Sequence, residues 1–190
     1  LTACMTGAVI PWGAGFTIDG TYFPMQIADI NIGLLYLLGV ISIGVYGIMI
    51  GGWSSNNKFA LLGALRASSQ MISYEVAMGL SLIALVMLTG TLNLGEIVAQ
   101  QDADYAYIVY QPLGFLIFII CAFAETNRAP FDLPESESEL VGGFHTEYSS
   151  LKFALFFLAE YVNMVAVSSL ATTLFLGGYH ALPGLGFTES

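Results

Sequence analysis

Four long runs of apolar residues constrain this chain more than any other feature of its sequence. A segment needs about 20 mostly apolar residues to cross the hydrocarbon core of a bilayer as an α-helix. The sequence therefore predicts complete spans at about residues 27–53, 60–91, 107–125 and 150–177, and a partial span at about residues 1–12. Only 9% of the 190 residues are charged, against about 25% in a soluble domain. We expect the chain to form an all-α, polytopic transmembrane helix bundle without a soluble domain.

The start of the chain and its cysteines add two expectations. The first residue lies inside an apolar run, without a starting methionine or the basic region of a signal peptide. We therefore expect a fragment of a larger protein with further helices at both ends. Cys4 and Cys121 also lie in apolar runs, where neither a disulfide framework nor a metal site is expected, so both are interpreted as packing residues.

The basic residues predict the orientation of the bundle. All four lie in or beside the connectors after the second and fourth predicted spans; they are Lys58, Arg66, Arg128 and Lys152. The other connectors, at 13–26 and 93–106, and the tail from residue 179 contain none. Because positive residues mark the cytoplasmic side of a membrane protein, the connector at 126–149 is predicted to be cytoplasmic, or on the matrix side in a mitochondrion.

The segment from Ala124 to Tyr148 concentrates acidic residues between two apolar runs. Its six carboxylates belong to Glu125, Asp132, Glu135, Glu137, Glu139 and Glu147. Acids next to membrane helices call for a specific use, and this density suggests proton handling or a docking surface. Arg128 could pair with Glu125 at the i, i+3 spacing, although a plain surface salt bridge explains such a pair equally well. His145, a single histidine in this connector, is given no role.

Two further glutamates lie within predicted spans. Glu75 is expected a little below the cytoplasmic interface, and Glu160 follows an apolar run, with Asn163 one turn further on the same face. Arg66 lies on the opposite side of the helix from Glu75, so the two cannot pair. Burial disfavours the charged form of a carboxyl group, so Glu75 and Glu160 could exchange protons if water or polar groups reach them. Alternatively, each makes one interhelical hydrogen bond and only holds the bundle together.

Other features exclude several classes of function. The aromatic residues of the last span are expected to face lipid or neighbouring helices; they are Phe153, Phe156, Phe157 and Tyr161. The sequence contains neither a Gly-rich phosphate loop nor a pattern of nucleophile and base. Nothing in the chain predicts bound electron carriers, a nucleotide, a metal or nucleic acid.

Five motifs together resemble a known family, the quinone-site membrane subunit of respiratory complex I, the NADH:quinone oxidoreductase. They are Gly51-Gly-Trp-Ser-Ser-Asn-Asn-Lys58, Ala60-Leu-Leu-Gly-Ala-Leu-Arg-Ala67, Ile72-Ser-Tyr-Glu75, Ala124-Glu-Thr-Asn-Arg-Ala-Pro-Phe-Asp-Leu-Pro134 and Phe157-Leu-Ala-Glu-Tyr161. The resemblance covers essentially the whole chain. It implies a bundle of about eight spans, of which this chain would contain the second half of span two through span six.

The resemblance also implies a function and partners. The chain would be a subunit without redox centres of a proton-translocating enzyme, whose NADH, FMN and iron-sulfur clusters bind partner subunits and whose substrate here is ubiquinone or menaquinone. Glu75, Glu125 and Glu160 would form a proton relay. The quinone cavity and coupling loop would contain Arg66, Arg128, Asp132, Glu135, Glu137, Glu139 and Glu147. The partners would be peripheral-arm iron-sulfur subunits at the connector and, laterally, small membrane subunits, antiporter-like subunits and the lipid bilayer.

Two alternatives remain open from the sequence. Membrane-bound hydrogenases contain a related protein that anchors a catalytic arm without reducing quinone, but the Glu-Thr-Asn-Arg and Phe-Asp-Leu-Pro pattern favours the quinone enzyme. A proton-coupled secondary transporter is the second alternative, although no internal repeat is visible. The expected location is a bacterial inner membrane, with the mitochondrial inner membrane as the alternative.

Overall fold

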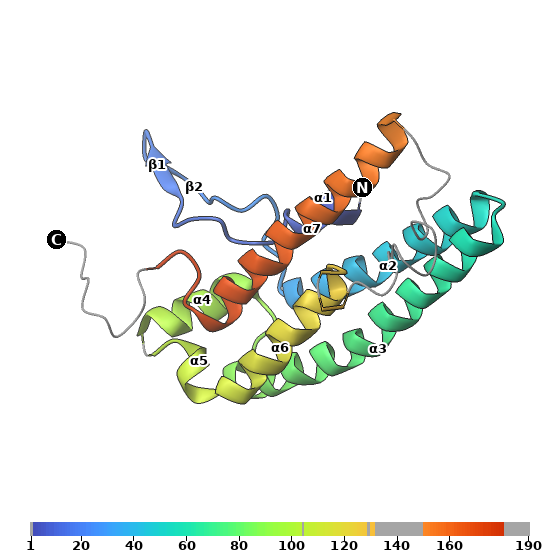
Figure 1. Cartoon of the computed structure of the whole chain (residues 1–190). Helices are drawn as coiled ribbons and strands as arrows, with labels where there is room; N and C mark the ends of the chain where they lie inside the picture. The colour runs from blue at the N-terminus through green and yellow to red at the C-terminus, as the bar shows by residue number, and fades with distance from the viewer. Residues whose placement is uncertain (1, 104, 129, 132–149, 181–190) are drawn as a thin grey trace.

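The computed structural model describes residues 2–103, 105–128, 130–131 and 150–180. Within these ranges the chain forms seven helices and one two-stranded hairpin (Figure 1). The helices are α1 (Thr2–Thr6), α2 (Gly33–Ser54), α3 (Lys58–Thr89), α4 (Leu94–Ala103), α5 (Tyr107–Tyr110), α6 (Pro112–Glu125) and α7 (Ser150–Phe175), and the strands are β1 (Phe16–Ile18) and β2 (Thr21–Phe23). The prediction of a helical bundle is confirmed.

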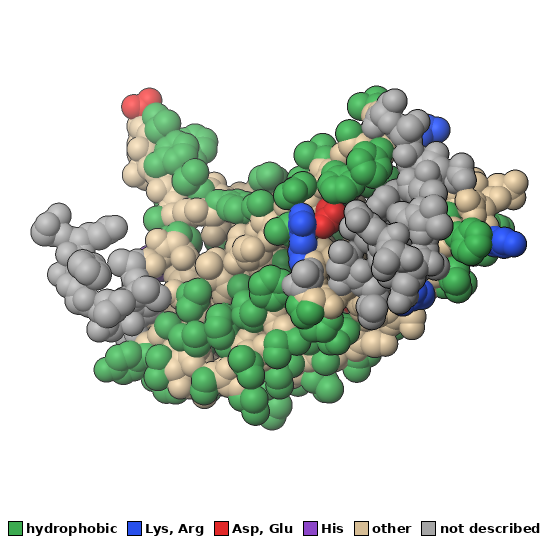
Figure 2. Space-filling view, in the orientation of Figure 1, with side chains coloured by type: hydrophobic (Ala, Val, Ile, Leu, Met, Phe, Trp, Pro, Cys, Tyr) green, Lys and Arg blue, Asp and Glu red, His purple; other side chains and the backbone are tan. Residues whose placement is uncertain are grey.

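Three of these helices are long and apolar enough to cross a membrane. They are α2, α3 and the Leu151–Phe175 part of α7. They carry many exposed apolar side chains, which suits contact with lipid or with other helices; examples are Ile43, Ile83, Met87 and Leu158. Figure 2 shows that hydrophobic side chains cover much of one face of the molecule. These elements build a membrane protein.

The predicted span at 107–125 is divided into α5 and α6. Pro112 is the first residue of α6, where its missing N–H is not needed. A proline also disfavours the helical conformation of the residue before it, and Gln111 accordingly has φ −132° and ψ 61°. The proline therefore ends one helix and starts the next, and α6 has 14 residues.

Two predicted connectors contain regular structure that was not expected from the sequence. In the segment at 13–26, Asp19 and Gly20 both have positive φ, 50° and 78°, and form the two-residue loop of the β1–β2 hairpin. In the segment at 93–106, the Asn93 side-chain oxygen accepts hydrogen bonds from the N–H groups of Gly95 and Glu96, at 2.8 and 3.2 Å. This is the N-cap arrangement that starts α4.

Helices α2 and α3 pack against each other along the bundle. They lie side by side and run in opposite directions, and α6 also packs against α3 (Figure 1). Close packing of α2 on α3 depends on Gly52, since an added Cβ would come within 2.2 Å of the Cβ of Ala64. The core between the helices is built from large buried side chains, among them Leu37, Leu82 and Phe118.

Two of the basic residues used to predict the orientation lie at one end of the bundle. The turn between α2 and α3 lies at the same end of the molecule as the start of α7 (Figure 1), so Lys58 and Lys152 mark one end of the bundle. The hairpin, α4 and α5 lie towards the opposite end. Which end faces the cytoplasm stays a prediction.

Candidate functional site

A cavity of about 220 Å³ lies between α1, α2, α7 and the end of α6. Its wall is apolar along α2, where Gly44 and Gly47 leave space, and along α7, where Phe156 and Phe157 lie. Its polar lining comes from α1, from the end of α6 with the two residues after it, and from α7: Thr2, Thr6, Glu125, Thr126, Asn127, Glu160 and Asn163. The cavity therefore joins carboxylates from elements that are distant in sequence.

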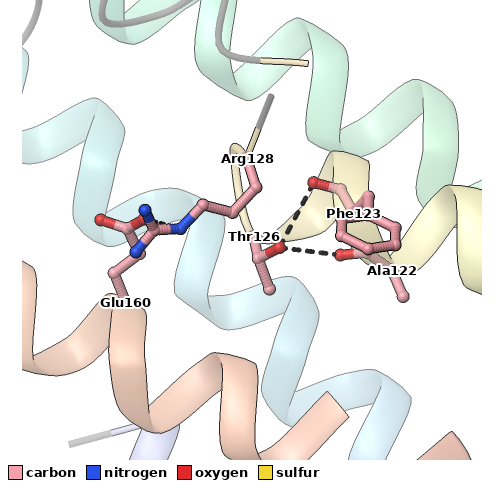
Figure 3. Close-up of polar contacts among 5 residues, drawn as sticks. All are labelled: Ala122, Phe123, Thr126, Arg128 and Glu160. Atoms are coloured by element: carbon pink, nitrogen blue, oxygen red, sulfur yellow. Dashed lines mark hydrogen bonds and ion pairs between the residues drawn. The ribbon is translucent and has the colours of Figure 1, made fainter. Parts of the chain in front are cut away.

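The end of α6 places the residues of the Glu-Thr-Asn-Arg motif. The N–H of Arg128 donates to the carbonyl of Phe123 at 3.2 Å, and that of Asn127 to the carbonyl of Ala124 at 3.4 Å. Asn127 has φ 50°, in the left-handed region, and together these features form a Schellman C-cap. The hydroxyl of Thr126 adds hydrogen bonds to the carbonyls of Ala122 and Phe123 (Figure 3).

This cap leaves Glu125 as the last residue of α6, with only 3% of its surface exposed. Glu125 and Asn127 both line the cavity. The side-chain oxygen of Asn127 is buried and has no hydrogen-bond partner within the part of the chain that the structure describes. A buried carboxyl group and a buried acceptor thus meet the cavity at the same helix end.

Arg128 turns from the cap towards α7. Its Nε lies 3.2 Å from Oε1 of Glu160 (Figure 3), and its guanidinium carbon lies 5.2 Å from the ring centre of Tyr161. The sequence allowed a pair between Arg128 and Glu125, provided that both residues belonged to one helix with i, i+3 geometry. That geometry does not apply, because the helix ends at Glu125 and Arg128 lies beyond it. The observed partner comes from another helix.

Three aromatic residues of α7 take part in the site in addition to the packing expected of them. Tyr161 contacts the guanidinium group and is not only a lipid-facing or packing residue, although half of it is exposed. Phe156 and Phe157 contribute to the cavity wall. Glu160 and Asn163 both line the cavity, as their shared helix face predicted.

Glu75 lies beside this cavity, on α3. It is half-buried, and the hydroxyl of Ser42 on α2 donates a hydrogen bond to its Oε1. Met71, one turn earlier on α3, lines the cavity, and Glu75 is close enough to Glu125 for their charges to interact. The structure therefore brings together Glu75, Glu125 and Glu160, the three residues predicted to form a relay.

Arg66 lies elsewhere. It borders a second, more open groove together with Gln70, Tyr74 and Phe131. Gln70 holds the segment after α6 against α3, because its amide donates to the carbonyls of Ala124 and Phe131 at 3.2 and 2.8 Å. Arg66 therefore lies at this groove, whereas Glu75, Glu125 and Glu160 lie in or beside the cavity.

The remaining predicted site residues lie outside the described residues. These are Asp132, Glu135, Glu137, Glu139 and Glu147, together with His145. Within the described ranges no group of three His, Cys, Asp or Glu side chains could hold a metal ion. Of the two free cysteines, Cys121 is buried as predicted, whereas Cys4 is exposed, so its interpretation as a packing residue is wrong within this chain.

Sequence reasoning missed Ser42 and Asn127. A serine within an apolar run was the only signal for Ser42, and its partner on α3 cannot be read from sequence. For Asn127, the signal was an asparagine directly after a helix end, which is a common left-handed C-cap.

Fold and cavity together define an integral membrane protein that keeps ionisable groups on the inside of a helical bundle. Comparison with known proteins specifies this class further: the chain belongs to the NADH dehydrogenase family, whose model matches residues 1–188. It is 65% identical over 94% of its length to an NADH-quinone oxidoreductase subunit of Cytophaga hutchinsonii. It is 61% identical over 97% of its length to the corresponding protein of Flavobacterium psychrophilum. These matches cover 52% and 53% of the two relatives, so the chain spans about half of their length.

Proposed function

We propose that this chain is part of the membrane subunit of a proton-pumping NADH:quinone oxidoreductase, in which its glutamates couple quinone reduction to proton translocation. The names of its relatives, which are subunits of NADH-quinone oxidoreductase, support the enzyme class. One observation carries the coupling role: Glu75, Glu125 and Glu160 come from three helices and gather in or beside one cavity. Ionisable groups inside a membrane bundle typically serve ion or proton pathways.

In this proposal, quinone reduction draws protons or changes the charge near the connector at 126–149, and the carboxylates relay that change into the bilayer. Glu75 and Glu125 lie close enough for their charges to interact, so a change in the charge of one carboxyl group affects the other. Glu160 responds through Arg128, because a carboxylate at 3.2 Å attracts the guanidinium strongly only while it is ionised. A proton arriving at Glu160 thereby weakens the contact that ties α7 to the end of α6.

The chain contributes no redox centre in this proposal. NADH, FMN and iron-sulfur clusters bind partner subunits, and the quinone is a substrate. Arg66 and the connector acids would lie towards the quinone cavity and the peripheral-arm subunits, while small membrane and antiporter-like subunits pack laterally. The signal reaches the antiporter-like subunits through a bistable element. The proposed location is a bacterial plasma membrane.

The relay is tested by changing its carboxyl groups to amides in the assembled enzyme. Glu75→Gln and Glu160→Gln each remove one proton-exchanging group with little change in size, so proton-coupled quinone reduction should fall about tenfold or more while assembly is retained. Turnover with NADH and quinone, together with proton uptake into vesicles, measures the effect. Glu96→Gln is the matched control, since Glu96 is exposed on α4 and remote from the cavity. Unchanged turnover in both variants would remove these residues from the relay.

Quinone binding is tested by photolabelling of the assembled enzyme. A photoreactive quinone analogue should label this chain, and excess quinone should compete with the label. An absence of label at saturating analogue would favour the hydrogenase-type anchor. A chain that purifies without iron-sulfur subunits and moves a solute would favour a transporter.

A further inference from the structure

Ser42 on α2 lies where two acceptors compete for one hydroxyl proton. Its Oγ is 2.9 Å from the backbone carbonyl oxygen of Leu38, one turn earlier on the same helix. The same hydroxyl also donates to Oε1 of Glu75 on α3. Both side chains are half-buried at the interface of α2 and α3. The proposed relay of glutamates gives Ser42 no role of its own.

A serine hydroxyl carries one donor and can also accept, and a carboxyl group changes from pure acceptor to donor when it binds a proton. An ionised Glu75 is therefore only an acceptor, and it accepts the hydrogen bond that the Ser42 hydroxyl donates. A protonated Glu75 instead donates to Ser42 Oγ, whose own O–H can then turn to the Leu38 carbonyl. A backbone carbonyl has two lone pairs, so Leu38 can accept this bond in addition to its helical one.

We propose that Ser42 is a positioning residue for Glu75, which lets this carboxyl group bind and release a proton while every donor and acceptor around it stays paired. The inference rests on the proposed relay role of Glu75. Protonation forms one O–H bond on the carboxylate, and the proton comes from the relay. Ser42 keeps its own O–H bond throughout and only rotates about its Cβ–Oγ bond, so charge and atoms balance.

The location of this pair fits such a role. Ile41, next to Ser42, and Met71, one turn before Glu75, both line the cavity that contains Glu125 and Glu160. The pair of Ser42 and Glu75 therefore lies beside the cavity, at the contact between the long helices α2 and α3. A buried carboxyl group with only one fixed partner would leave a group unsatisfied in one of its two states, which would oppose proton exchange.

A second serine provides a matched comparison. The hydroxyl of Ser168 on α7 donates to the carbonyl of Met164, at 2.7 Å, in the same i to i−4 geometry as Ser42 and Leu38. Its acceptor is this backbone carbonyl and not a carboxylate. Ser168→Ala therefore removes the local helix contact without affecting a titratable group.

The experiment is redox-induced infrared difference spectroscopy of the whole assembled oxidoreductase, with turnover measured in parallel. A carboxylic acid C=O band that disappears in Glu75→Gln identifies Glu75. In Ser42→Ala this band should move to higher frequency, because the protonated acid loses its acceptor, and turnover should fall about tenfold. Ser42→Thr keeps the hydroxyl and should restore both band and turnover. Ser168→Ala should change neither.

The outcomes separate this inference from the proposed function. A band that disappears in Glu75→Gln but stays in place in Ser42→Ala would overturn the role of Ser42 and leave the relay intact. Absence of any Glu75 band, together with normal turnover of Glu75→Gln, would overturn the relay itself. If Ser42→Ala fails to assemble, Ser42→Cys replaces it. The thiol sulfur is a weaker acceptor than the hydroxyl oxygen, so the band should shift in the same direction, and an unmoved band would again contradict the inference.

Discussion

At the scale of single residues, Arg128 shows how one side chain can connect two helices. Its backbone is fixed by the C-cap of α6, while its guanidinium meets two successive residues of α7, Glu160 and Tyr161. The carboxylate supplies a charge that can change, and the aromatic ring supplies an attraction that cannot. Tyr161 therefore holds Arg128 near α7 even while Glu160 is neutral.

This division of roles predicts the effect of changing Tyr161. Tyr161→Leu should lower proton-coupled turnover about two- to fivefold, because an exposed cation–π contact contributes about 0.5–1 kcal/mol. Tyr161→Phe keeps the ring and should behave like the wild type. The measurement is a double-mutant cycle of turnover with Arg128→Ala. An equal loss from Tyr161→Leu in both backgrounds would show that the ring acts independently of Arg128.

At the scale of elements, Gln101 joins three parts of the chain at the end of the bundle remote from Lys58. It is completely buried on α4. Its side-chain oxygen accepts from the N–H groups of Tyr107 and Gly177, at 3.2 and 3.0 Å, and its amide donates to the carbonyl of Thr173 at 2.9 Å. The short helix α4 is thereby tied to the start of α5 and the end of α7.

Gln101→Leu should therefore destabilise the bundle by about 3 kcal/mol or more, because each backbone group left buried and unpaired costs about 1–3 kcal/mol. The expected result is a lower melting temperature of the purified enzyme and a smaller yield of assembled protein. Gln100→Leu is the comparison: Gln100 is exposed on the same helix, so water can replace its hydrogen bonds to the Tyr107 hydroxyl and the Thr89 carbonyl. Equal losses from the two variants would contradict the bridging role of Gln101.

At the scale of the whole molecule, the sequence predicted what depends on apolar length and little of what depends on tertiary contact. The runs around residues 27–53, 60–91 and 150–177 became long helices, because a bilayer demands continuous helical hydrogen bonding. Helix α4 was missed, since its ten residues contain four polar side chains and pack through Gln101. The hairpin carried a visible Asp-Gly signal, although its segment was predicted only as a connector.

The site divides in the same way. Because they are carboxylates within or beside apolar runs, Glu75, Glu125 and Glu160 were predicted as relay residues. The structure places them in or beside one cavity. Their partners were beyond sequence reasoning, because Ser42 and Arg128 reach their carboxylates across helix interfaces. The residue types were visible in the sequence, whereas their pairing depends on the packing of α2 on α3 and of α7 against the end of α6.

The packing also makes the predicted orientation testable in the intact membrane. Lys58 and Lys152 are exposed at one end of the bundle, and Asp19 is exposed in the hairpin towards the other. Single cysteines at these positions, with Cys4 and Cys121 replaced by serine and alanine, can be labelled with a membrane-impermeant maleimide. Because positive residues stay on the cytoplasmic side, Lys58→Cys and Lys152→Cys should react in inside-out vesicles and Asp19→Cys in right-side-out vesicles. Labelling of Asp19→Cys and Lys58→Cys from the same side would contradict the bundle's transmembrane placement. Reversal of all three would contradict the predicted cytoplasmic position of the connector at 126–149.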